Sequence, residues 1–310
     1  CPVRGRAQYV GDARVEALVA GKVFGETEIT KKALWEFARS QDEEGYLAAN
    51  YPTGKIINIP TYVLQWVNML WEYYQNSQDK ETLQSLYPHL KKLLAFFEKK
   101  EGENGFLLKQ ENWWVFIDHG EMVATQDDSL VLQTSYFGAL VDAAKIAGLL
   151  NDQVNQNHFT QKAEDLKKKI NDYFWVEEKN LFDDCRSENG FCQHFSFQAN
   201  YWALYWEVVS EEKKKILLDN LLNNRFNLAE SQTPYFNGFV AEVLFKNGKE
   251  KEAVDFIKNY WGQMIQAGAT TWWESFNPET LSTNARMGES MAHAWGSLPS
   301  YLLQKYLIKD

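Results

Sequence analysis

The residues best suited to chemistry are carboxylates that lie among aromatic rings. Glu274 directly follows two tryptophans, Trp272 and Trp273, in a segment that begins Gly-Ala-Thr-Thr. A carboxylate beside large apolar rings lies in a low dielectric, which raises its pKa and suits it to proton transfer. The alternative interpretation is an ordinary exposed glutamate in a loop.

A second segment, 112–119, places Asp118 and His119 after an aromatic run that includes Trp113 and Trp114. Adjacent rings followed by an acid and an imidazole fit a platform for stacking a sugar, with a polar anchor beside it. A buried aromatic cluster, with Asp118 capping the next element, fits the same letters equally well.

The first twelve residues hold a third group, in which Arg4, Arg6, Tyr9 and Asp12 precede a helical pattern. Asp12 could bind a ligand, but an acid at the start of a helix is also common for structural reasons. A fourth candidate is His293, in a His-Ala-Trp-Gly run. A lone histidine is more often structural than catalytic.

The sequence contains no nucleophile elbow, phosphate-binding loop, dinucleotide fingerprint or zinc-binding His-Glu-x-x-His motif. Carboxylates and aromatic rings therefore remain as the groups that could carry out or support a reaction. Glycoside hydrolysis needs that combination, because one acid protonates the leaving oxygen while one base activates water. Aromatic residues make up 15% of the chain and include 12 tryptophans, which suits either a sugar site or a ring-rich core.

Helical elements must position these segments, because apolar residues recur mostly with the helical period. Asp79 is expected to cap one helix, and Asn247-Gly248 to separate two others. Sustained strand alternation is hard to find, but short stretches such as 105–108 and 113–117 could be small strands within loops. About twelve helices are predicted, at roughly 11–24, 27–41, 60–76, 79–99, 128–149, 157–174, 194–208, 210–223, 235–247, 249–266, 286–296 and 298–307.

These helices would pair into about six hairpins, which stack as an open solenoid or close into a toroid. Long loops rich in Trp, Asp and Glu would then gather at one end of the scaffold. No linker or low-complexity stretch divides the 310 residues, so a single domain spanning 1–310 is expected.

Charge and composition exclude several classes of partner. A net charge of −10 argues against nucleic acid and anionic membranes. No apolar run is long enough to span a bilayer, and no signal peptide is recognised, which is compatible with a cytoplasmic or a periplasmic location. Of the three cysteines, Cys185 and Cys192 could close a small loop or remain as two free thiols.

Taken together, the four segments resemble the bacterial α-L-rhamnosidases, the six-hairpin glycosidases of glycoside hydrolase family 78. That family opens its catalytic toroid with Cys-Pro-x-Arg-Glu, followed seven residues later by the Asp of a Gly-Asp pair. Here Cys1, Pro2, Arg4, Gly11 and Asp12 match this pattern. The later motifs are matched in family order by Trp114, Phe116 and Asp118, with His119 replacing a Trp, then by 268–274 and by 293–295.

The resemblance implies an all-α (α/α)6 toroid and inverting cleavage of terminal α-L-rhamnosides, without a metal or other cofactor. It makes Glu274 the general base that activates water. An apolar wall of aromatic loops would accept the 6-methyl group of rhamnose. The substrate-binding residues implied are Arg4, Tyr9, Asp12, Trp114, Asp118, Trp273 and His293.

One departure concerns the general acid, because Gly5 stands where the family has its catalytic Glu. Without that donor, cleavage of poor leaving groups is expected to slow by about 10²–10⁴-fold. Three explanations follow: a substituted but otherwise active enzyme, a sugar-binding pseudoenzyme, or a substitute acid such as Asp12 or Glu289.

Two further alternatives stay open. A different glycosidase or a uronate-processing enzyme could use the same toroid, with Arg4, Arg6 and Arg14 as possible partners of a uronate. A helical scaffold for protein partners would instead form an open solenoid. Family members usually carry flanking β-sandwich domains, so the sequence resembles an excised or minimal catalytic core.

Overall fold

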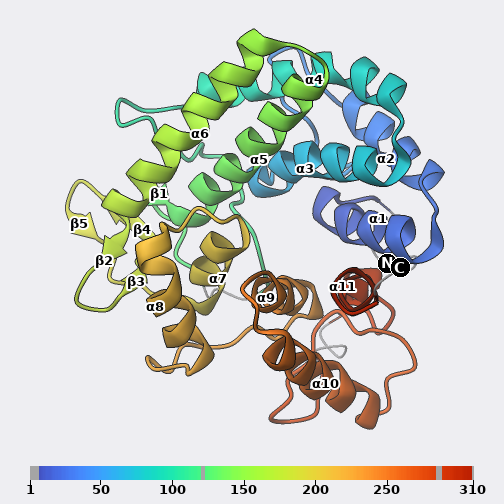
Figure 1. Ribbon diagram of the computed structural model, residues 1–310, viewed down its shortest axis with the longest axis vertical. Coiled ribbons are helices and arrows are strands. Elements are labelled where there is room, and N and C mark those ends of the chain that lie inside the picture. The colour runs from blue at the N-terminus through green and yellow to red at the C-terminus, as the bar shows by residue number, and fades with distance from the viewer. Residues whose placement is uncertain (1–6, 120–122, 284–287, 309–310) are drawn as a thin grey trace.

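A computed structural model describes residues 7–119, 123–283 and 288–308 as a closed ring of helices (Figure 1). Six helices line the inside, and each contacts the next around the ring until the last returns to the first. The inner helices are α1 (Val10–Phe24), α3 (Pro60–Ser77), α5 (Leu130–Leu149), α7 (Phe197–Tyr205), α9 (Pro234–Lys246) and α11 (Leu298–Tyr306).

The outer layer alternates with the inner one along the chain. Within the described ranges it consists of α2 (Glu28–Arg39), α4 (Lys80–Glu98), α6 (Gln153–Tyr173), α8 (Glu211–Leu222) and α10 (Glu250–Gln266). This inner–outer alternation confirms the predicted (α/α)6 toroid and excludes the open solenoid that a protein-binding scaffold required. No helix in the described ranges is long and apolar enough to cross a membrane.

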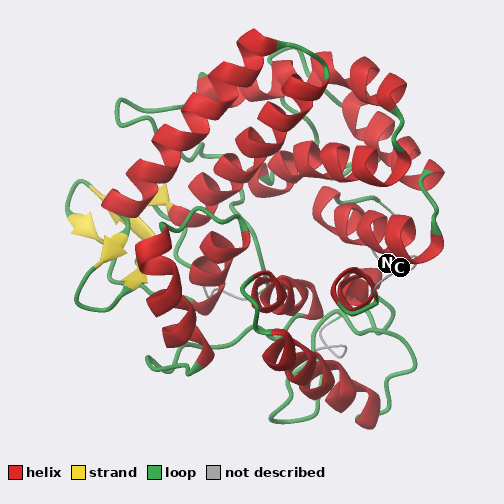
Figure 2. Cartoon of the chain, in the orientation of Figure 1, coloured by secondary structure: helices red, strands yellow, loops and turns green. Residues whose placement is uncertain are grey.

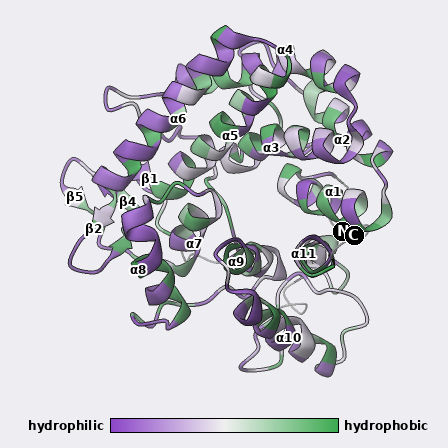
Figure 3. Ribbon diagram, viewed as in Figure 1, coloured by the Kyte–Doolittle hydropathy of each residue, from purple (hydrophilic) through white to green (hydrophobic). Residues whose placement is uncertain are grey.

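Hydrophobic patterning explains which helices lie inside. In α5, 15 of 20 residues are buried, whereas in α6 only five of 21 are. A helix that is apolar on all sides must be covered on all sides, while a helix with one apolar stripe can face water. Figure 3 shows the same contrast, with purple hydrophilic faces along α6 and α8.

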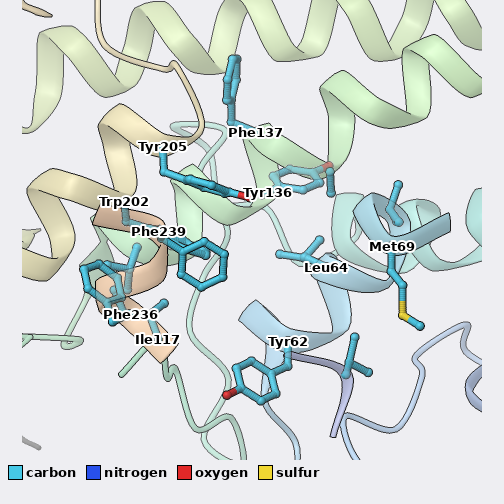
Figure 4. Packing of buried hydrophobic residues seen from close by; sticks show 14 of the residues in the cluster. Tyr62, Leu64, Met69, Ile117, Tyr136, Phe137, Trp202, Tyr205, Phe236 and Phe239 are labelled. Atoms are coloured by element: carbon cyan, nitrogen blue, oxygen red, sulfur yellow. The ribbon is translucent and has the colours of Figure 1, made fainter. Parts of the chain in front are cut away.

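Large rings from different inner helices meet in the core (Figure 4). Trp202 and Tyr205 of α7 stack with their ring centroids 5.2 Å apart, and both contact Phe239 of α9 edge-on. Burying such side chains supplies about 1.5–3 kcal/mol each, so these contacts between neighbouring helices help to hold the ring closed.

Two of the expected helix signals operate as predicted. The Asp79 side chain accepts a hydrogen bond from the Thr82 amide at 3.0 Å and so caps α4. Gly248 adopts a φ of 69° between α9 and α10, a left-handed conformation that glycine takes without strain.

The two stretches considered as possible short strands form no regular strand. Residues 113–117 form no strand, and near 105–108 only an isolated bridge joins Leu107 to Glu101. The strands instead gather at one side of the ring (Figure 2). They are β1 (Asp128–Ser129), β2 (Trp175–Val176), β3 (Leu181–Phe182), β4 (Cys185–Ser187) and β5 (Gly190–Phe191).

Cys185 and Cys192, which the sequence allowed to be either bonded or free thiols, are joined in a disulfide. Cys185 lies in β4, and Cys192 follows β5. Strand β4 pairs antiparallel with both β1 and β5, so the bond closes a small hairpin that packs at the start of α5.

The helix predicted at 286–296 was also wrong over its described part. Residues 288–293 are non-helical, and a short 3-10 helix, η2 (Ala294–Ser297), leads into α11. Backbone pairing with the preceding loop overrides the helical pattern, since the His293 amide donates to the Trp272 carbonyl at 2.7 Å. Gly288, with a φ of 92°, turns the chain toward this pairing.

Candidate active site

Glu274 is held rigidly although it lies in a long loop. Only 2% of the residue is exposed. Its amide donates to the Ser290 carbonyl at 2.8 Å, and the Ser290 amide donates back to the Glu274 carboxylate at 2.6 Å. Trp295 donates its indole N–H to the Glu274 carbonyl at 3.2 Å. These bonds fix the direction of the carboxylate.

His119 is the ionisable neighbour of that carboxylate. Its Nε2 lies 3.4 Å from Oε1 of Glu274. Burial opposes a charge on His119, but the hydrogen bond and the negative charge of Glu274 outweigh burial and raise the pKa of the imidazole. A protonated His119 in turn favours the ionised form of Glu274, which is the form that a base requires.

Asp12 lies in the first turn of α1. Burial, and then the neighbouring charge of Glu16, raise the pKa of Asp12 to about 7, and Glu274 adds to the effect. His293, which lies near the other end of the sequence, has its Nε2 atom 3.5 Å from Asp12 Oδ1. Asp12, with its raised pKa, and Glu274 therefore share one site, and two carboxyl groups are what acid–base chemistry needs.

Gly11 explains how α1 brings Asp12 so close to the centre of the ring. A Cβ atom at Gly11 would lie 2.4 Å from the ring of Tyr62 on α3. Only glycine allows this approach. The start of α1 is also tied down by a hydrogen bond from the Val10 amide to the Ala49 carbonyl at 2.9 Å.

These groups open into one pocket of about 320 Å³. Its polar lining includes Asp12, Glu16, His119, Glu274 and His293, and its walls are largely aromatic. The aromatic lining is Tyr9, Tyr62, Trp114, Phe116 and Trp295. His293 stacks on Trp295 with ring centroids 4.3 Å apart, so the imidazole is fixed in orientation.

The two adjacent tryptophans have different surroundings. Trp113 is 5% exposed and packs against Phe97 and Tyr46, as the interpretation of a buried cluster predicted. Trp114 is 50% exposed and lines the pocket, as the interpretation of a stacking platform predicted. The buried cluster is therefore confirmed for Trp113, and a stacking role for Trp114 stays a prediction.

Asp118 is buried, and protein donors occupy its carboxylate. It accepts hydrogen bonds from the His119 amide at 2.9 Å, from Ser231 at 2.7 Å, from Gln198 at 3.3 Å and from Thr233. Burial raises the pKa of Asp118, and these bonds oppose that rise. The side chain therefore ties the loop that carries His119 to α7 and to the segment before α9.

A second cavity of about 620 Å³ adjoins the pocket, because Trp114, Phe116 and His119 line both. Asp118 faces this second cavity. So does His194, which follows the disulfide hairpin and which the sequence did not single out.

The structure thus brings together Tyr9, Asp12, Trp114, Glu274 and His293 around one pocket. Arg4 and Gly5, the position of the expected acid, lie outside the described residues. Trp273 is 5% exposed and packs against Phe276 instead of lining either cavity.

Sequence reasoning missed Tyr62, Glu16 and Trp295 as pocket residues. The pattern did carry a signal for Glu16, because it follows Asp12 by four positions and so lies on the same face of the helix.

The whole arrangement matches a known family. Residues 1–307 match the model of the bacterial α-L-rhamnosidase six-hairpin glycosidase domain. An α-L-rhamnosidase of Formosa agariphila is 26% identical over 252 residues, which cover 74% of this chain and 24% of that protein.

Solved structures agree with this match. The family 78 rhamnosidase of Bacillus sp. GL1 superimposes with a TM-score of 0.87 at 26% identity, covering 98% of this chain and 32% of that one. A Klebsiella oxytoca rhamnosidase with rhamnose bound gives a TM-score of 0.87 at 25% identity, covering 99% and 60%.

A mannosylglycerate hydrolase of Thermus thermophilus shares only the fold, with a TM-score of 0.76 at 14% identity, covering 97% of this chain and 95% of that one. The chain spans about a quarter of the length of the curated relative and about a third of the Bacillus enzyme. It belongs to the bacterial α-L-rhamnosidase family of six-hairpin glycosidases.

Proposed function

We propose that this domain hydrolyses terminal α-L-rhamnosides with inversion at the anomeric carbon. Glu274 accepts a proton from water while the water oxygen bonds to the anomeric carbon. The bond from that carbon to the leaving oxygen breaks at the same time, and a general acid protonates the leaving oxygen. The observation that carries the proposal is the pocket that Glu274 shares with Asp12 and His293.

The charge pair between His119 and Glu274 supports the choice of base. A buried glutamate on its own would favour the protonated form and could not accept a proton. The imidazole at 3.4 Å offsets that burial. Because His119 stands where the family has a tryptophan, this chain would stabilise its base by charge where its relatives have an apolar ring.

Sugar recognition is assigned to the remaining pocket residues. Asp12 and His293 would bind the hydroxyl groups, and Tyr9 and Trp114 would pack on the ring and its 6-methyl group. Arg4 is proposed to bind the sugar on the family resemblance alone. The buried contacts of Asp118 and Trp273 favour roles in positioning the loops that carry His119 and Glu274.

Besides its proposed contact with a sugar hydroxyl group, Asp12 is the best substitute for the acid missing at Gly5. With a pKa of about 7 it remains largely protonated below neutral pH and can donate. Glu289, the other carboxylate considered, accepts a hydrogen bond from Ser275 and is not among the residues that line the pocket. With Asp12 as the acid, rhamnosides whose leaving group needs little protonation should be cleaved faster than those whose leaving group is the hydroxyl of another sugar.

A uronate substrate is less favoured than a neutral deoxy sugar. Arg14, one of the possible uronate partners, is 1% exposed and forms a two-point ion pair with Glu72 at 2.6 and 3.0 Å. Its guanidinium also donates to Tyr205 and Gln65, so it is committed to the interior.

Restoring the acid with Gly5→Glu tests the proposal. The variant should cleave natural rhamnosides at least about 10²-fold faster than the parent and aryl rhamnosides by a smaller factor. Gly54→Glu, in an open loop where a side chain meets nothing within 4 Å, is the matched control for added charge.

Three outcomes separate the alternatives. A folded Gly5→Glu protein that cleaves no α-L-rhamnoside would show that the substrate is wrong. Calorimetric binding of rhamnose, with no gain in rate from Gly5→Glu, would identify a sugar-binding pseudoenzyme. A gain that is larger for natural rhamnosides than for aryl rhamnosides supports an enzyme that lacks only its proton donor.

A further inference from the structure

A group of side chains that can bind metal lies outside the site at Glu274. Asp183, Cys185 and Cys192 meet at the base of the hairpin that β4 and β5 form, on the side of the ring where the strands gather (Figure 2). A carboxylate oxygen of Asp183 and the two sulfur atoms all lie within 4.8 Å of one another. Two cysteine sulfurs and a carboxylate form a ligand set that suits a soft divalent cation such as Zn²⁺.

The disulfide must be reduced before these sulfurs can bind a cation. A dithiol can do this, because its first sulfur bonds to the Cys192 sulfur and displaces Cys185 as a thiol. Its second sulfur then bonds to the first and releases Cys192, so that two electrons and two protons pass to the protein and the reductant becomes a disulfide. A divalent cation that binds both cysteines displaces the two thiol protons.

The hairpin gives access to the group and needs little rearrangement. Cys192 lies toward solvent, whereas Cys185 and Asp183 are fully buried. The Cα atoms of the two cysteines are 5.5 Å apart. Rotation about the Cα–Cβ bonds can therefore separate the freed sulfurs to about 3.8 Å, which is the distance between two sulfurs on one tetrahedral zinc ion.

Backbone amides hold the Asp183 carboxylate in place and leave it able to bind. Its Oδ1 accepts hydrogen bonds from the amides of Cys185 at 3.3 Å and His194 at 3.4 Å. Its Oδ2 accepts one bond, from the Gln193 amide at 2.7 Å. Since each oxygen of an ionised carboxylate offers about two lone-pair positions, Oδ2 keeps one for a cation. Carboxylates that bind metals are commonly oriented by such bonds.

The local charges also favour a cation. Two thiolates beside a buried carboxylate carry three negative charges, which a divalent cation offsets. The basic side chains of the segment 183–194 are engaged elsewhere. Arg186 donates to the Tyr173 carbonyl at 2.6 Å and stacks on the Tyr173 ring. The Nδ1 atom of His194 lies 2.8 Å from Oδ2 of Asp184, which is fully buried.

We propose that Cys185, Cys192 and Asp183 bind one Zn²⁺ ion in the reduced protein, with water as the fourth ligand. The inference does not rest on the proposed function, because this ion takes no part in cleaving a sugar. The hairpin is then closed in both redox states, by the disulfide when it is oxidised and by the cation when it is reduced.

Closure of the hairpin matters because two inner helices begin beside it. Strand β4 pairs with β1, which leads directly into α5. The carboxylate of Asp184, next to Cys185, accepts bonds from the amide and hydroxyl of Ser196, each at 2.9 Å. Ser196 immediately precedes α7. An open hairpin loosens the starts of both helices, so the cation should stabilise the reduced fold.

Calorimetry on the whole chain tests the inference, with Zn²⁺ as the probe. All proteins carry Cys1→Ser, because Cys1 lies outside the described residues and its thiol is also able to bind a metal. They are reduced with a dithiol, which anaerobic gel filtration then removes. The reduced protein should bind one Zn²⁺ per chain with a Kd below about 1 μM. The oxidised protein should bind none at this affinity, and Mg²⁺ should not compete.

Variants identify the ligands. Cys185→Ser and Cys192→Ser should each weaken Zn²⁺ binding by more than about 100-fold, because loss of an outer partner of a ligand already costs about 10–100-fold. Asp183→Asn keeps an acceptor for the amides but removes the charge, and should weaken binding by at least about tenfold. Asp128→Asn is the matched control. Asp128 is a partly buried carboxylate of the same sheet but is not in the group, so its variant should bind as the parent does.

Several results would overturn the inference. One is a reduced, folded protein with two free thiols that binds no Zn²⁺, which would make the hairpin a disulfide staple only. Others are equal binding by the oxidised protein, or parental affinity in either serine variant or in Asp183→Asn. Thermal melting reports whether each protein is folded, and Zn²⁺ should raise the Tm of the reduced parent and of Asp128→Asn but not of the serine variants. Since no measurement involves a sugar, failure here leaves the proposed function untouched.

Discussion

His119 Nε2 lies 3.4 Å from Glu274 Oε1, and this pair joins two loops that are far apart in the sequence. His119 follows the aromatic run of one motif, and Glu274 ends the run of another. The pair places an imidazole with a raised pKa against the proposed base at the boundary between the two cavities.

Replacing His119 by Trp, the residue of the family pattern, removes this imidazole. The negative charge on Glu274 then loses its hydrogen-bonded partner, so the pKa of the base should rise. In a Gly5→Glu background, the acidic limb of kcat/KM should move to higher pH. An unchanged acidic limb would mean that His119 does not stabilise the charge on Glu274.

Asp12 should make stability depend on pH in a defined direction. Its pKa is raised from the ordinary 3.8 to about 7, so the folded protein binds the proton more tightly than the unfolded chain. The contribution is fully present below about pH 4, falls as the pH rises toward 7 and is constant above that. Urea unfolding at several pH values should show a steeper decline for the parent than for Asp12→Asn. Parallel curves would contradict the raised pKa.

Gly11→Ala should destabilise the fold, because its Cβ would meet the Tyr62 ring at 2.4 Å. A clash of this kind in a packed interior costs about 1–3 kcal/mol. Gly262→Ala in helix α10 is the control, since a Cβ there meets nothing within 4 Å and should stabilise the helix by about 0.5–1 kcal/mol. Equal melting temperatures for the two variants would refute the close approach of α1 to α3.

Arg14→Met should cost about 3–5 kcal/mol, because it leaves the Glu72 carboxylate without its buried partner. The double variant Arg14→Met, Glu72→Met should recover much of that loss, since no lone charge remains. Denaturant unfolding measures both values. A double variant that is no more stable than the single one would show that the cost comes from lost packing of the arginine.

The sequence predicted most of the helices because their apolar period is a local property. Helices α3 and α5 are apolar on nearly every side, which is the pattern of the inner layer. The helix expected at 286–296 failed for a non-local reason. The backbone pairing of Ser290 with Glu274 spans sixteen positions, and the sequence around either residue contains no signal for it.

The candidate site shows the same division between features with a local sequence signal and features that depend on non-local contacts. Glu274, Asp12 and His293 could be named from motifs, whereas the pair between His194 and Asp184 could not, because it depends on how a hairpin packs against the ring. The Asp118 motif was found from the sequence. Three of the four residues that donate hydrogen bonds to its carboxylate, Gln198, Ser231 and Thr233, are at least eighty positions away. Folding, and not spacing, decides which carboxylates remain available to a ligand.

The most direct test of the central claim is the configuration of the first sugar released. Proton NMR should follow hydrolysis of an aryl α-L-rhamnoside by Gly5→Glu, with Gly5→Glu, Glu274→Gln alongside it. The account predicts that β-L-rhamnose appears first, before mutarotation, and that the Glu274→Gln change lowers the rate by about 10²–10⁴-fold. Initial release of α-L-rhamnose, or an undiminished rate without Glu274, would contradict it.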